Sequence, residues 1–130
     1  MPYHGGPWVS VGREESVYID CHNDTILGII LGGEDFTNGS PSLHIDLPKI
    51  LSVPKLGVLY FAAWCDPVYQ GSLAVTKSVE ILRRIRALAQ ENSDHLEIAG
   101  HMSDVDRIAA CGKVSILPTV EGGQPLMVLR

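Results

Sequence analysis

The distribution of apolar residues along the chain predicts four strands. From Val17 to Asp24 apolar and polar residues alternate, which is the period of a strand. A second run is apolar on both faces, as in a buried parallel strand. Pro118 weakens the last assignment, because proline cannot donate a hydrogen bond to a neighbouring strand. The predicted strands are residues 17–24, Leu56–Trp64, Leu96–Ala99 and Val114–Glu121.

Two amphipathic helices are predicted between these strands. Apolar residues recur every three or four positions from Val75 to Ala89, which predicts a helix of about five turns. A shorter helix is expected to begin at Ser103, whose hydroxyl can cap it, and to end at Gly112. Alternating strands and helices are typical of an α/β protein with parallel strands and right-handed crossovers.

The segments between the first two strands are harder to assign. Residues 25–31 are apolar and fit either the start of a helix or a continued strand. Residues 32–41 are rich in turn-forming residues and predict a loop. His44–Leu51 predicts a short helix that Pro48 interrupts. Residues 1–15 carry three Gly and two Pro without any period, so we expect a flexible N-terminal arm that precedes a domain at 16–130.

Composition and charge limit the possible functions. A chain of 130 residues is the size of one domain. Its 10 Lys and Arg against 15 Asp and Glu give a net charge of −5, so a nucleic-acid partner is not expected. No apolar stretch is long enough for a signal peptide or a membrane span, which predicts a cytoplasmic protein. Three widely spaced cysteines favour neither a disulfide framework nor a thiolate zinc site.

The end of the first strand offers the most informative chemistry. Residues two apart in a strand share a face, so Asp20, His22 and Asp24 are expected to point together. An imidazole nitrogen and a nearby carboxylate can hold one divalent cation such as zinc. Ligands also gather beyond the carboxyl ends of parallel strands, where this motif lies. The alternative is that His22 and Asp24 bond to each other or cap the next helix.

Glu121 is the second candidate ligand. It follows the last strand and precedes Gly122 and Gly123, which let the backbone turn sharply. Its two carboxylate oxygens could bridge two metal ions. If the first and last strands run in the same direction, Glu121 converges on His22 and Asp24. A solvated glutamate in a turn is the alternative.

Other candidates carry weaker signals. Trp64, at the exit of the second strand, could form the wall of a substrate pocket. His44 lies in a second His-x-Asp pattern, but no strand end is predicted there. Cys65 has no neighbouring base that would activate its thiol. The signatures of serine hydrolases, P-loop proteins and dinucleotide-binding proteins are absent from the sequence.

Four segments, taken in order, resemble the N-terminal third of the membrane dipeptidase (renal dipeptidase, peptidase M19) family. They are Ile19–Thr25, His44–Pro48, Gly57–Trp64 and Glu121–Gly123. The resemblance implies a (β/α)₈ TIM barrel that hydrolyses dipeptides by a metal-bound hydroxide, with two zinc ions. It implies that His22 and Asp24 hold one ion and that Glu121 bridges both.

The resemblance also implies that much of the enzyme lies outside this sequence. A complete barrel has eight strands and about 250 residues, whereas three or four strands are predicted here. The family's remaining ligands, and its catalytic groups, come from strands beyond Glu121. We therefore expect a fragment that is largely inactive alone and that associates with itself through its open sheet.

Two other functions remain open on the sequence. The apolar segment Pro125–Arg130 could dock on another chain, which would make the protein a non-catalytic α/β interaction module. A metal-dependent hydrolase of a different amide or ester is the third possibility.

Overall fold

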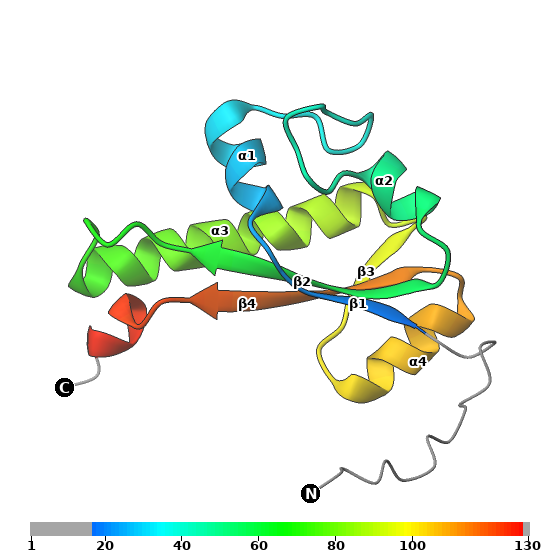
Figure 1. Ribbon diagram of the computed structural model, residues 1–130. Helices are drawn as coiled ribbons and strands as arrows, with labels where there is room; N and C mark the ends of the chain where they lie inside the picture. Colours follow the sequence, from blue (N-terminus) through cyan, green and yellow to red (C-terminus); the bar gives the residue numbers. More distant parts are fainter. Residues whose placement is uncertain (1–16, 129–130) are drawn as a thin grey trace, which may run out of the picture.

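A single parallel sheet forms the centre of the computed structural model, which describes residues 17–128. Its four strands lie in the order β1-β2-β4-β3, and every neighbouring pair is parallel. Figure 1 shows all carboxyl ends of the long strands at the same edge of the sheet. The strands are β1 (Tyr18–Asn23), β2 (Leu56–Trp64), β3 (Leu96–Ile98) and β4 (Val114–Glu121). The α/β class and the four strands are confirmed.

Pro118 is tolerated in β4 because the neighbouring strand β3 is too short to pair with this part of β4. The short strand β3 pairs with β4 only along Val114–Ile116. Pro118 lies beyond this part, opposite Phe61 of β2. Since no described strand pairs with its other side, the missing N–H disrupts no ladder there.

The helices cover both faces of the sheet. In Figure 1, α1, α2 and α3 lie on one face and α4 on the other. Within residues 17–128, no helix combines the length and the apolar character that crossing a membrane requires. The 3₁₀ helix η1 packs against α3 and leaves Leu126 exposed. The helices are α1 (Thr25–Gly32), α2 (Leu47–Ser52), α3 (Gly71–Glu91), α4 (Met102–Ala110) and η1 (Gln124–Val128).

Three helix starts differ from the sequence expectation. Pro48 does not interrupt α2, because it occupies the first turn, where a backbone N–H has no helical partner. Ser103 is not the cap of α4. His101 occupies that position, and the Asp104 carboxylate accepts its backbone N–H at 2.9 Å. Helix α3 begins at Gly71, one turn before the expected start.

The segment after β1 is a helix rather than a continued strand. Helix α1 ends at Gly33, whose φ of 67° is a left-handed conformation that glycine adopts without strain. The sequence left this segment open because its residues are apolar throughout. The loop predicted after it is confirmed. The first fifteen residues, the predicted arm, lie outside the described residues, as do Leu129 and Arg130 of the apolar C-terminus.

The core lies between the sheet and the helices α1 to α3. Leu59, Phe61 and Ala63 alternate along β2 and are buried against helix residues such as Ile85. The ring of Phe36, from the loop after α1, meets Phe61 edge to face with centroids 6.3 Å apart. All three cysteines are free, and Cys65 is the buried one.

A buried carboxylate fixes the loop between α1 and α2. Asp46 is 2% exposed and caps α2 by accepting the backbone N–H of Lys49 at 2.9 Å. It also accepts the Lys49 ammonium at 2.6 Å and the Ser40 N–H at 3.1 Å. Burial acts to raise the pKa of Asp46, but the hydrogen bonds from Lys49 and Ser40 outweigh it, so the pKa lies below its usual value. These hydrogen bonds tie the loop to the first turn of α2.

We expect Asp46→Ala to lower the free energy of unfolding by roughly 2–4 kcal/mol, since it removes a helix cap and leaves a buried N–H unpaired. Because the pKa of Asp46 is lower in the folded chain, its stabilisation is complete above the unfolded value of about 3.9 and is lost as the pH falls through the folded value. Urea unfolding at neutral and acidic pH measures both effects. Asp94→Ala, at an exposed position, is the control, and equal effects of the two changes would contradict the expectation.

Candidate metal centre

An extra residue in β1 determines which side chains face the site. Asp20 lies opposite Leu59 of β2, and Asn23 lies opposite Phe61, so β1 advances three residues while β2 advances two. This β-bulge places Asp20 and Asn23 on the face of the sheet that Leu59 and Phe61 share. Asp20 borders the same hollow as His22 and Asp24, but its carboxylate is not among the three ligand atoms that converge. The strand's alternation of side chains between the two faces is interrupted at the bulge.

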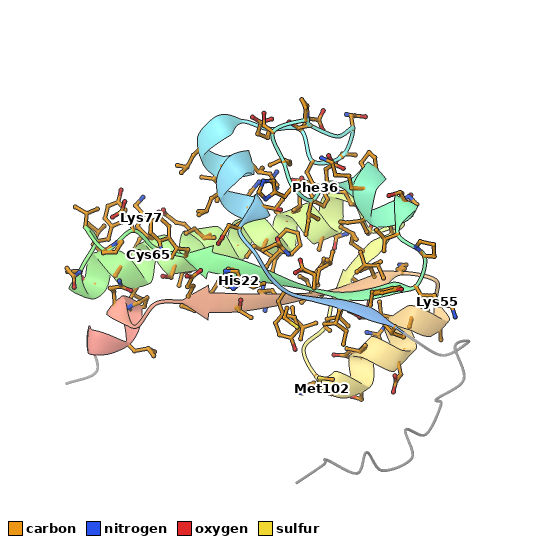
Figure 2. The ribbon with its side chains drawn as sticks, in the orientation of Figure 1. His22, Phe36, Lys55, Cys65, Lys77 and Met102 are labelled. Atoms are coloured by element: carbon orange, nitrogen blue, oxygen red, sulfur yellow. The ribbon has the colours of Figure 1, made fainter. Side chains whose placement is uncertain are left out.

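His22, Asp24 and Glu121 come together at the carboxyl edge of the sheet. His22 Nε2 is 3.3 Å from Glu121 Oε2 and 3.7 Å from Asp24 Oδ1. Each residue offers one ligand atom, and the three atoms lie within 4.8 Å of one another. Figure 2 shows His22 at the end of β1, beside β2 and β4. Among residues 17–128, these three residues form the group of potential metal ligands that lie close together.

The parallel topology accounts for this convergence. Glu121 ends β4 and His22 lies near the end of β1, while β2 runs between these two strands. Asp24 follows β1 directly and precedes the first residue of α1. The three side chains are 52%, 56% and 42% exposed, in the order His22, Asp24 and Glu121. A small ion or molecule can therefore reach all of them from solvent.

The donor set suits a divalent metal such as zinc. The imidazole nitrogen is a borderline ligand and the two carboxylates are hard ligands. Zinc accepts both kinds in one site. The two carboxylates offer oxygens within 4.8 Å of each other, so their negative charges repel. A bound cation removes that repulsion. The residues present therefore fit a metal ion.

Trp64 lies next to the metal-binding candidates in the sheet but lines a different hollow. It is in register with Glu121 across the β2–β4 pair. The hollow it lines has a volume of about 420 Å³ and lies between α1 and α3, where Leu27, Tyr69 and Lys77 also contribute. Its role in substrate binding stays a prediction.

His44 borders the site, although its sequence pattern carried only a weak signal. A hollow of about 420 Å³ is lined by His22 and Asp24 on one side and by Ser42 and His44 of the loop on the other. His44 reaches this position because the loop is held by Asp46, two residues later. The His-x-Asp pattern at 44–46 was the available signal, and its aspartate forms hydrogen bonds with Ser40 and Lys49.

Gly122 allows the chain to turn directly after Glu121. Its φ is 90°, and a Cβ added there would collide with the side chain of Gln124. We expect Gly122→Ala to cost about 1–3 kcal/mol of stability and to displace Glu121 from His22. Gly123→Ala is the matched control, because its φ is not in the left-handed region and no atom lies within 4 Å of an added Cβ. Thermal unfolding of both variants measures the difference, and equal losses would contradict it.

Comparison with known proteins identifies the fold. The structure is similar to dipeptidase AC, a metallopeptidase of family M19, with a TM-score of 0.72 and 17% identity over 83% of this chain and 36% of that one. It is also similar to a Rhodobacter sphaeroides metallopeptidase liganded with a phosphinate mimic of the dipeptide L-Ala-D-Ala, with a TM-score of 0.73 and 15% identity over 83% and 38% of the two chains. No curated protein matches the sequence.

Parallel strands with intervening helices make this an α/β fold, and the fold matches part of each of these two metallopeptidase structures. The sequence profile of the membrane dipeptidases, peptidase family M19, matches residues 12–129. The chain therefore belongs to this family of metallopeptidases. It spans 36% and 38% of the two similar structures.

Proposed function

We propose that this chain provides part of the metal centre of a zinc-dependent dipeptidase, with His22, Asp24 and Glu121 as ligands. The observation that carries the proposal is the convergence of one imidazole and two carboxylates within 4.8 Å. Membership of the membrane dipeptidase family supports it.

Each residue has a separate task in this proposal. His22 donates its Nε2 lone pair, which requires the neutral imidazole, and Asp24 supplies a carboxylate to the same ion. Glu121 has a second oxygen that can serve a second ion, and its charge offsets that of the cation pair. When bound, the metal supplies a Lewis acid and lowers the pKa of water toward about 7. The exposure of the three side chains leaves room for water and substrate.

The substrate we propose is a dipeptide, as the family name and the ligand of the Rhodobacter sphaeroides structure indicate for those proteins. The scissile carbonyl would lie beside the three ligands. Turnover by this chain alone is expected to be slight, since the described residues supply three ligands for a centre of two ions.

Binding of a phosphinate mimic of L-Ala-D-Ala tests the proposal. We expect the mimic to shift the backbone amide NMR signals of residues 22–24 and 121 in the zinc-loaded chain and to leave the metal-free chain unchanged. His22→Ala should abolish the shifts, whereas His95→Ala, at an exposed loop position, should keep them. Shifts that are equal with and without zinc, or absent from the zinc-loaded chain, would contradict the proposal.

A further inference from the structure

A network of hydrogen bonds holds the bulge that precedes Asp24. The Asp20 carboxylate accepts the backbone N–H of His22 at 3.2 Å through Oδ1. Through Oδ2 it accepts the side-chain amide of Asn23 at 2.9 Å. The same Asn23 amide nitrogen donates to the carbonyl oxygen of Tyr60 on β2 at 3.0 Å. The bulge is therefore fixed both within β1 and to the neighbouring strand.

The network determines where His22 points. Asp20 and Asn23 are in register with Leu59 and Phe61, so the extra residue between them breaks the regular alternation at Cys21 and His22. In this arrangement the His22 Nε2 lies 3.3 Å from Glu121 Oε2. Without the bulge, the period of two would place His22 on the same face as Asp20, and Asn23 on the opposite one.

Asn23 has a buried polar atom without a hydrogen-bond partner in the described part of the chain, and this destabilises the fold. Its side chain is 8% exposed, and among the described residues its Oδ1 has no hydrogen-bond partner. A buried acceptor without a partner is unfavourable. Packing alone does not account for the two hydrogen bonds that the Asn23 amide nitrogen donates. Together with the unpaired Oδ1, they indicate that Asn23 determines the geometry of the bulge.

We propose that Asn23, acting through Asp20 and the bulge, is a positioning residue that presents His22 to the metal. This inference rests on the proposed function, because His22 must bind metal for its orientation to matter. Groups that orient metal ligands typically change metal affinity by about 10–100-fold when they are altered.

Two isosteric substitutions separate positioning from simple electrostatics. In Asn23→Asp two carboxylates face each other and the bond between these side chains is lost. In Asp20→Asn one acceptor oxygen becomes an amide nitrogen, so the side chain can accept from the His22 N–H or from Asn23 but not from both. Positioning predicts that both variants bind zinc about 10–100-fold more weakly. Electrostatics alone predicts opposite signs, because Asn23→Asp adds a negative charge near the cation and Asp20→Asn removes one. The double variant Asp20→Asn/Asn23→Asp restores a donor and an acceptor at unchanged net charge and should recover part of the affinity.

A readout without metal completes the test. In the metal-free wild type we expect a nuclear Overhauser effect between the His22 ring and the Glu121 side chain, and its loss in both single variants. Cys21→Ser, an exposed change on the same strand, should preserve both this effect and zinc affinity. Should Asn23→Asp fail to fold, the nuclear Overhauser effect in metal-free Asp20→Asn carries the test, because the lost charge by itself would weaken zinc binding by that variant but would not move the His22 ring.

The outcomes distinguish the two proposals. A wild type that does not bind zinc overturns the proposed function, and the inference with it. A wild type that binds zinc, with both single variants matching it, overturns the inference alone. Tighter binding by Asn23→Asp also overturns it.

Discussion

Glu121→Gln is expected to weaken zinc binding by more than about 100-fold. Changes in groups that only orient metal ligands already lower metal affinity by about 10–100-fold. Gln at position 121 removes the charge of a candidate ligand that lies 3.3 Å from His22. The substitution conserves shape, so the fold should be kept. Competition with a chromophoric chelator measures the affinity.

Glu97→Gln is the matched control for this prediction. Glu97 lies on β3 and forms ion pairs with Arg107 at 2.8 Å and Lys113 at 3.9 Å. It loses the same charge but lies outside the candidate centre. An equal loss of affinity in both variants would mean that net charge, and not ligation by Glu121, governs zinc binding.

Phe61→Ala should lower the free energy of unfolding by about 3–5 kcal/mol. Phe61 is fully buried at the middle of β2 and meets Phe36 edge to face, so truncation leaves a cavity between the sheet and the loop after α1. This is a large part of the 5–15 kcal/mol that stabilises a typical domain. Urea unfolding followed by circular dichroism measures the change.

Val68→Ala is the control for the core prediction, because Val68 is 74% exposed and should change stability by less than about 0.5 kcal/mol. A loss below about 1 kcal/mol for Phe61→Ala would show that the sheet does not pack against the helices as described. The two substitutions together test the fold independently of metal.

The long parallel strands were predictable because their signal is local. Leu56–Trp64 and Val114–Glu121 are observed with the predicted bounds. The first of them is apolar throughout, as expected for a strand that is buried on both faces. The convergence of His22, Asp24 and Glu121 followed from the rule that parallel strands present their carboxyl ends at one edge. Helix α1 was ambiguous because its apolar residues have no clear period.

The parts that escaped prediction depend on contacts distant in sequence. The bulge between Asp20 and Asn23 appears only when β1 is aligned with β2, some forty residues later, and it interrupts the regular alternation of β1. The place of His44 depends on the loop that Asp46, Lys49 and Ser40 hold together. Short patterns such as His-x-Asp do not show which aspartate will bind a metal and which will be buried.

The central claim is that His22, Asp24 and Glu121 bind one metal together. Calorimetric titration of the metal-stripped chain with zinc, beside His22→Ala, tests it most directly. We predict micromolar or tighter binding by the wild type and no measurable binding by His22→Ala. Absence of binding by the wild type, or equal binding by both proteins, would contradict the claim.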